Sequence, residues 1–139
     1  MNRKNLAIIG FVALIAIALY VFSNQKSPPP SGSGAPLVAV TLPTLSTAEV
    51  QGKLKYDQSC ASCHGENAAG QDGVAPPLVH RIYEPNHHGD RAFFQAALSG
   101  VRAHHWPFGD MPPVAGITQD DVAEIINYVR ALQRANGIK

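Results

Sequence analysis

The stretch that decides the fold is SCASCHGENAAG, residues 59–70. It holds both cysteines of the 139-residue chain, Cys60 and Cys63, with His64 directly after the second. On a helical turn, side chains three residues apart share one face, so both sulfur atoms point to the same side. His64 is rotated from Cys63 by about 100°. A disulfide between the two cysteines would close a very small loop and constrain the unfolded chain little, so a structural bridge explains the pair poorly.

The C-x-x-C-H spacing is the signature of covalent haem attachment, in which each sulfur bonds one vinyl group and the imidazole reaches the iron. A structural zinc site needs four ligands, and the chain has no second cysteine pair, although a distant histidine could complete a site. A thioredoxin-like redox pair needs a βαβ context, and no strand pattern is visible. The sequence therefore predicts one covalently bound haem c, attached at Cys60 and Cys63 with His64 as an iron ligand.

A second iron ligand is sought among methionines and histidines. Apart from Met1, the chain has one methionine, Met111, in the loop sequence FGDMPP. Two prolines stiffen that loop and remove competing amide donors. His104 and His105 lie close by in the sequence and remain rivals. Trp106 could donate its indole N–H to a haem propionate, or it could be a packing residue.

Three helices are expected between residues 46 and 137, with loops rich in Pro, Gly and His between them. The first begins at a capping box, Ser46-Thr47-Ala48-Glu49, carries Val50 and Leu54 at helical spacing, and runs to about residue 59. The second begins near Asp90 as N-cap and stops at Gly100; its apolar side carries Phe93, Phe94, Ala97 and Leu98. The third is capped by Thr118, ends at Gly137, and buries a stripe made of Val122, Ile125, Ile126, Val129 and Leu132.

The segment from residue 46 to 137 resembles a class I c-type cytochrome. In that family the first and last helices cross through a glycine and aromatic side chains. Gly52 and Tyr56 match one side of this crossing, and Tyr128 matches the other. The resemblance implies an all-α fold of three main helices around one covalently bound haem.

The family also has a Gly-Pro-x-Leu segment after the haem-binding histidine, and APPL, residues 75–78, matches it with Ala75 in place of glycine. The resemblance implies that the Pro76 carbonyl accepts a hydrogen bond from His64 and that Leu78 packs on the haem. It also favours Met111 over the histidines as the second iron ligand, because the family's ligand methionine is commonly followed by proline.

The N-terminal part predicts a membrane anchor and a tether. Residues 6–22, LAIIGFVALIAIALYVF, are an unbroken apolar run of about 26 Å as a helix. Arg3 and Lys4 precede the run, which places the N-terminus in the cytoplasm. The expected domains are a transmembrane anchor at 1–25, a Pro/Gly/Ser-rich linker with an extended lead-in at 26–45, and a cytochrome c domain at 46–139. A cleaved signal peptide is the alternative; either way the domain is exported to the periplasm of a bacterium.

The expected function is electron transfer by a membrane-tethered monohaem carrier that is not itself an enzyme. A formal net charge of +1 gives no indication of nucleic-acid binding. The expected partners are a quinol-oxidising complex and a terminal oxidase or reductase. Two alternatives remain open: a haem-based ligand binder or peroxidase with a displaceable sixth ligand, and a copper-handling protein that uses His87, His88, His104 and His105.

Overall fold

The computed structural model describes residues 15–17 and 33–139. The predicted anchor at 1–25 lies outside these residues except for residues 15–17, which are helical, and the first part of the predicted linker lies outside them too. Within the described ranges, no helix has the length and apolar character required to cross a membrane. The anchor therefore stays a prediction.

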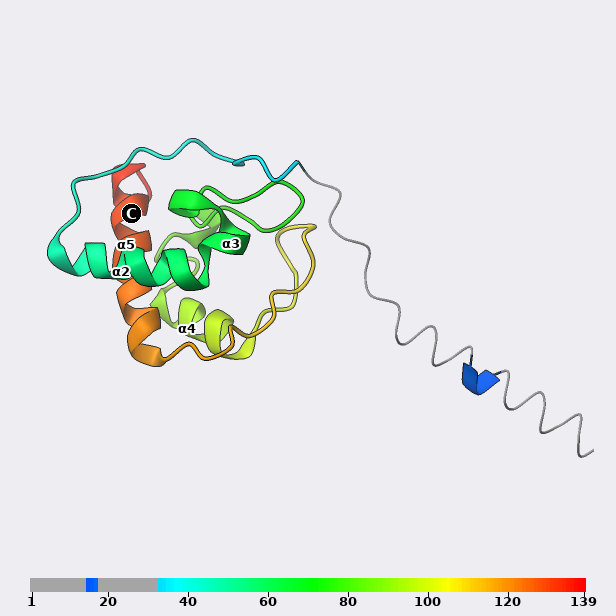
Figure 1. The fold of residues 1–139 in the computed structure, drawn as a ribbon. Coiled ribbons are helices and arrows are strands. Elements are labelled where there is room, and N and C mark those ends of the chain that lie inside the picture. Colours follow the sequence, from blue (N-terminus) through cyan, green and yellow to red (C-terminus); the bar gives the residue numbers. More distant parts are fainter. Residues whose placement is uncertain (1–14, 18–32) are drawn as a thin grey trace, which may run out of the picture.

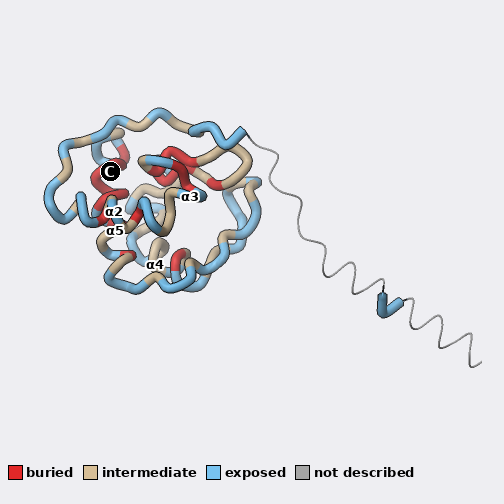
Figure 2. The backbone as a smooth tube through the Cα atoms, in the orientation of Figure 1, coloured by how far each residue is buried: buried red, intermediate tan, exposed pale blue. Residues whose placement is uncertain are grey.

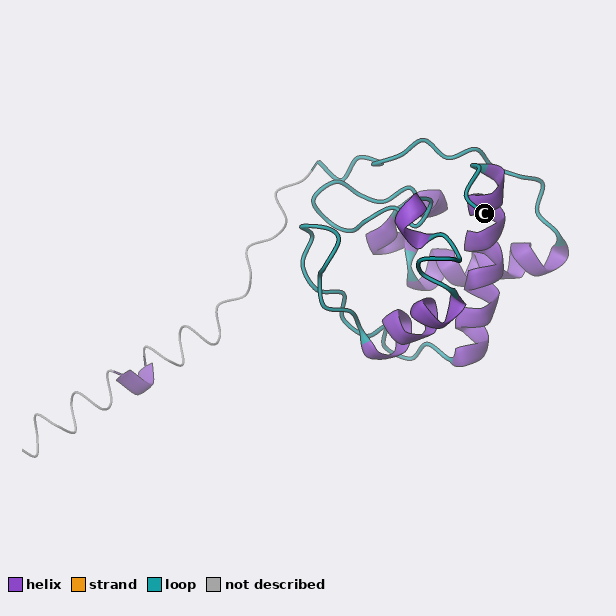
Figure 3. Ribbon diagram, turned by 180° about the vertical axis from the view of Figure 1, so that it is seen from behind, coloured by secondary structure: helices purple, strands orange, loops and turns teal. Residues whose placement is uncertain are grey.

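The helices within residues 33–139 give an all-α fold, as predicted (Figure 1). The elements in chain order are α2 (Thr47–Ser59), α3 (Ala61–His64), η1 (Glu66–Ala68), η2 (Arg81–Tyr83), α4 (Asp90–Ser99) and α5 (Gln119–Ala135). No strand occurs in this part of the chain; its only β pairings are two isolated bridges, Gln71 with Ala75 and Val101 with Met111. Seen from behind, the three longer helices stand on one side, and long loops form the other (Figure 3).

Local capping chemistry sets the ends of the three longer helices. Ser46 caps α2 through a complete capping box with Glu49. Thr118 caps α5 in the same way, with Asp121 as the reciprocal partner. The prediction that Asp90 caps α4 is wrong: Gly89 is the N-cap and Asp90 is the first helical residue. The Asp90 carboxylate instead accepts a hydrogen bond from Arg130 at 2.9 Å, so a tertiary contact takes the group that local capping would have used.

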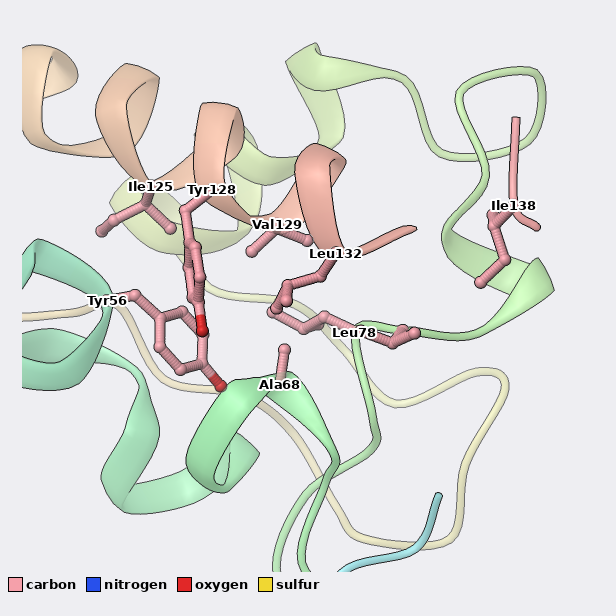
Figure 4. Close-up of a cluster of buried hydrophobic side chains, with 9 residues drawn as sticks. Tyr56, Ala68, Leu78, Ile125, Tyr128, Val129, Leu132 and Ile138 are labelled. Atoms are coloured by element: carbon pink, nitrogen blue, oxygen red, sulfur yellow. The ribbon is translucent and has the colours of Figure 1, made fainter. Parts of the chain in front are cut away.

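Helices α2 and α5 cross at Gly52, where their backbones touch. A Cβ atom placed on Gly52 would lie 2.0 Å from the carbonyl oxygen of Glu124 and 3.0 Å from the Cβ of Tyr128. Only glycine permits so close an approach. One turn along α2, the ring of Tyr56 packs against that of Tyr128 with centroids 5.5 Å apart (Figure 4).

The core lies where α5 meets α2 and the loops that follow α3 (Figures 2 and 4). Its main cluster is Tyr56, Ala68, Leu78, Val79, Ile125, Tyr128, Val129, Leu132 and Ile138. The whole predicted stripe of α5 is buried. Three apolar residues that recur at helical spacing or lie on the apolar side of a predicted helix are exposed: Val50 by 41%, Leu54 by 55% and Leu98 by 38%. In α2 the close contact at Gly52 selects the buried face, so the side chains at 50 and 54 turn to solvent.

The extended lead-in crosses the surface of the domain, as expected (Figure 1). Leu37 donates its backbone N–H to the Ala69 carbonyl at 3.0 Å. Thr41 and Asn136 form two hydrogen bonds of 2.9 Å each. The Thr41 N–H donates to the side-chain oxygen of Asn136, and the side-chain amide of Asn136 donates to the Thr41 carbonyl. The lead-in thus contacts both the loop after α3 and the end of α5 before the chain enters α2.

Candidate haem site

The two cysteines and His64 lie on one tight turn at the end of α2. Cys60 is both the C-cap of α2 and the residue before α3, and its carbonyl accepts hydrogen bonds from the N–H groups of Cys63 at 3.1 Å and His64 at 2.9 Å. The side chains of Cys60 and Cys63 both line one cavity, together with that of His64. The turn therefore presents two sulfurs and one imidazole to the same space.

The turn is held from behind by a buried phenol. Gly65 ends α3 with a φ of 76°, and a Cβ there would lie 2.5 Å from the Gly70 carbonyl oxygen. Gly70 in turn donates its N–H to the His64 carbonyl at 2.7 Å. The Tyr56 hydroxyl donates to the Gly65 carbonyl at 2.8 Å. Because Tyr56 belongs to the helix crossing, the position of the turn is coupled to the packing of α2 on α5.

His64 has a defined tautomer. Its Nδ1 lies 2.8 Å from the Pro76 carbonyl oxygen, which can only accept, so Nδ1 carries the proton and Nε2 keeps a free lone pair. Burial lowers the pKa of His64, and the hydrogen bond to Pro76 opposes this shift only in part. The imidazole is 8% exposed. A neutral imidazole oriented by a carbonyl is the form in which histidine ligates a metal.

The cavity has a volume of about 390 Å³, within the usual range for pockets that bind an organic cofactor. Most of its wall is apolar, with contributions from Val74, Leu78, Phe93, Val101, Phe108 and Ile125. Met111 lines the same cavity as His64, although the two belong to segments far apart in the sequence. Pro76 and Trp106, also singled out from the sequence, line it as well. Tyr56 does not line it and acts from behind the turn.

The loop that carries Met111 is pinned to the end of α4. Met111 and Val101 exchange two backbone hydrogen bonds of 2.9 Å each. Gly100 makes this pairing possible, because its φ is 78° and a Cβ there would lie 2.7 Å from the Met111 carbonyl oxygen. The Asp110 carboxylate accepts the Ala103 N–H at 2.8 Å and closes the loop. Met111 is therefore held at the cavity by backbone contacts on both sides of the loop.

Trp106 contributes an unusual polar group to the cavity. Its Nε1 atom is buried and has no hydrogen-bond partner in the part of the chain that the structure describes. The indole stacks on Phe108, with centroids 5.9 Å apart, and meets the edge of His80 at 5.1 Å. A buried N–H without a partner is costly, so the atom fits a site that an acceptor from a bound group would complete.

Arg130 is a structural residue of the site that sequence reasoning missed. It lies on α5 and is only 8% exposed. Its guanidinium donates to the carbonyls of Tyr83 at 2.6 Å and His88 at 2.7 Å, and to Asp90 and Gln133. The ring of Phe93 lies 4.9 Å below it. Its place four residues after Ile126, on the buried stripe, was the signal that could have revealed it.

A thiolate metal site does not fit this geometry. Burial, with a smaller contribution from Cys63, raises the pKa of the Cys60 thiol to about 11. A bound metal ion would itself deprotonate the thiol, so the neighbouring ligands decide whether a zinc site is present. Among the described residues, neither cysteine belongs to a group of three or more potential metal ligands. The zinc alternative is therefore poorly supported.

Comparison with known proteins agrees with the geometry. The family model for cytochrome c matches residues 49–133. A cbb3-type cytochrome c oxidase subunit, CcoP, from Azospirillum brasilense is 39% identical over 71 residues, which cover 46% of this chain. The match spans 23% of the length of CcoP, so this chain is similar to one part of that protein. No solved structure matches the chain.

The residues present fit the cofactor that this family carries. The cavity is apolar, a neutral imidazole with a free Nε2 faces it, two cysteines line it, and an unpartnered indole N–H is available for an acceptor. Covalent attachment to a C-x-x-C-H motif defines the group as haem c. The chain thus belongs to the cytochrome c family, and it is a c-type cytochrome of class I that carries a covalently bound haem c.

Proposed function

We propose that the domain is a monohaem electron carrier of a bacterial respiratory chain, in which the haem iron accepts and releases one electron. The observation that carries this proposal is the presence of His64 and Met111 on the wall of one apolar cavity. Two protein ligands on the iron leave no position for substrate. The expected chemistry is then electron exchange, without catalysis on a bound molecule.

Each residue of the site has a distinct task in this proposal. Cys60 and Cys63 would form the thioether bonds to the haem, and His64 would bind its iron through Nε2. Met111 would supply the second iron ligand through its thioether. A thioether ligand in an apolar pocket raises the reduction potential, because it favours the less charged ferrous state.

The remaining residues of the site orient and enclose these ligands. Pro76 fixes the ring plane of His64 and raises its basicity through the 2.8 Å hydrogen bond. Leu78 packs in the wall, and Tyr56 holds the turn through the Gly65 carbonyl. Trp106 donates its Nε1–H to a propionate, which would satisfy the atom that lacks a partner.

The N-terminal segment supports a place for the domain at a membrane. In our proposal residues 1–25 anchor it in the bacterial inner membrane with the N-terminus in the cytoplasm, and residues 26–45 tether it in the periplasm. A tether raises the effective concentration of the domain near membrane complexes. The similarity to a cbb3-type oxidase subunit supports a terminal oxidase as electron acceptor, and a quinol-oxidising complex is the matching donor.

Replacement of the second iron ligand tests this function. In holoprotein from an export-competent host, Met111→Ala should retain covalent haem, lose the thioether–iron charge-transfer band and lower the reduction potential, because the ligand that favours ferrous iron is gone. The matched controls are His104→Ala and His105→Ala, which should keep the band. If the band survives in Met111→Ala and disappears in a histidine variant, the ligand assignment is wrong.

Carbon monoxide separates the carrier from a ligand-binding haem protein. Reduced wild-type protein should not bind carbon monoxide rapidly at neutral pH, whereas Met111→Ala should, because its sixth position is open. Rapid stoichiometric binding by the wild type would support a sensor or peroxidase instead. A pyridine spectrum of the denatured, reduced protein should report two thioether bonds; a colourless protein would contradict the whole assignment.

A further inference from the structure

Four histidines from two separate loops gather at one rim of the haem cavity. His87 and His88 follow η2, while His104 and His105 lie in the loop after α4. We call this group the histidine cluster. His88, His104 and His105 line the cavity, and His87 does not. The cytochrome function assigns no task to these four side chains.

The rings of the histidine cluster are mutual neighbours. The ring of His105 has centroid distances of 4.2 Å to His104, 5.2 Å to His88 and 5.4 Å to His87. Those of His87 and His88 are 4.7 Å apart. In His87, His88 and His105, one ring nitrogen of each lies within 4.8 Å of the others. Two nitrogens on a tetrahedral zinc ion are about 3.4 Å apart, so modest rotation of these side chains brings all three onto one ion.

Hydrogen bonds fix the tautomers of two rings of the histidine cluster, His88, which is one of the three potential ligands, and its neighbour His104. The Nδ1 atom of His88 lies 2.6 Å from the Ile82 carbonyl oxygen, and that of His104 lies 2.8 Å from the Arg102 carbonyl oxygen. Since a carbonyl only accepts, each Nδ1 carries the proton and each Nε2 has a free lone pair. Protein histidines that ligate metals typically have this arrangement.

The backbone of the histidine cluster is also fixed by the core. Arg130 donates to the His88 carbonyl at 2.7 Å from a buried position on α5. The backbone N–H groups of His87 and His88 both bond the Glu84 carbonyl, at 3.0 and 2.8 Å. A loop held in this way presents its imidazoles with little freedom of the backbone, which lowers the entropic cost of binding an ion.

We infer that His87, His88 and His105 form a site for a divalent transition-metal ion, Cu²⁺ or Zn²⁺, separate from the haem iron. Three neutral imidazoles favour these ions, whereas Ca²⁺ and Mg²⁺ require oxygen ligands. Three protein ligands leave a fourth position for water on a tetrahedral ion. This inference rests on the proposed role of Met111 as second iron ligand, because His105 can serve the second metal site only if it does not bind the haem iron.

A metal titration of the full-length holoprotein tests the site. After treatment with a chelator, the protein should bind one Cu²⁺ per chain, with nitrogen hyperfine structure in the electron paramagnetic resonance spectrum. Cu²⁺ should displace Zn²⁺ that is already bound, since both ions use the same three imidazoles and Cu²⁺ binds such sites more tightly. The double variant His87→Ala/His105→Ala should weaken binding by more than about 100-fold, because even the outer partners of metal ligands change affinity about 10–100-fold.

The matched control is His80→Asn, which replaces a histidine outside the cluster. His80 caps η2 by accepting the Ile82 N–H at 3.2 Å, and asparagine keeps an acceptor there. This variant should bind metal as the wild type does. His87 and His105 are both exposed, so their replacement should leave the fold intact.

Two results would overturn the inference. One is equal affinity of the double variant and the wild type, which would place the ion elsewhere. The other is a wild type that binds neither ion at micromolar concentration. If in that case the double variant changes the pH dependence of the haem reduction potential, the histidines serve the haem propionates instead.

Discussion

Replacement of Gly52 by alanine tests the helix crossing on which the site depends. The new Cβ would lie 2.0 Å from the Glu124 carbonyl oxygen, whereas ordinary contacts begin at 3.4 Å. The backbones of α2 and α5 would have to separate by about 1.4 Å, the difference between these two distances. The atom in the way belongs to the backbone of α5, whose inner face is buried. It therefore cannot move aside as a flexible side chain could.

The expected cost follows from two opposing effects. Overpacking costs about 1–3 kcal/mol, and we expect the upper end because backbone atoms clash. Alanine is favoured over glycine inside a helix by about 1 kcal/mol. The free energy of unfolding should therefore fall by about 2 kcal/mol. For a domain of this size that lowers the melting temperature by about 8–16 °C.

Chemical unfolding of the holoprotein, followed by far-ultraviolet circular dichroism and haem absorbance, measures this change. The matched control is Gly89→Ala. Gly89 has a φ of −60°, and its nearest neighbour to a new Cβ is the Pro85 carbonyl oxygen at 3.4 Å. This control should change stability by less than about 1 kcal/mol. If Gly52→Ala unfolds at the wild-type denaturant concentration, the two helices do not touch as described and the reasoning fails.

Two further predictions concern the supports of the fold. Arg130→Met should lower the free energy of unfolding by about 2–5 kcal/mol, because buried acceptors such as the His88 carbonyl lose their donor. Denaturant unfolding measures this loss. Unchanged stability would show that the guanidinium contributes little. Asp121→Asn tests the cap of α5. The pKa of Asp121 is lowered to about 2, first by its hydrogen bond to Lys55 and then by Thr118. Its stabilising effect is therefore present above the unfolded pKa of 3.8 and is lost as pH falls towards 2. Denaturant midpoints of wild type and Asp121→Asn should differ at pH 6 and converge near pH 2, and a constant gap would argue against this role.

Predictions from sequence succeeded where the signal is local. The capping boxes at Ser46 and Thr118 involve side chains and amides within three residues of each other, so the pattern alone indicates the helix start. The stripe of α5 repeats at the helical period and is buried as expected. Asp90 has the same local preference for an N-cap, but its carboxylate is used by Arg130, forty residues away.

Burial was harder to predict for a helix in which either of two faces could pack against the core. Val50 and Leu54 recur at helical spacing, yet both are exposed. The burial of α2 is decided at Gly52, where close approach of Glu124 sets the orientation of the helix. A hydropathy pattern cannot predict this orientation, because glycine has no side chain that would mark the buried face of the helix.

The sequence by itself determined the cofactor and predicts its point of attachment, because thioether formation and iron ligation by adjacent residues need only the spacing of C-x-x-C-H on one turn. Tertiary structure alone decided which distant residues share the cavity, how Arg130 is buried, and that two histidine pairs meet at its rim. These features depend on how α4, α5 and their loops pack together. Packing brings together residues that are far apart in the sequence, and no periodic pattern in the sequence marks such pairs.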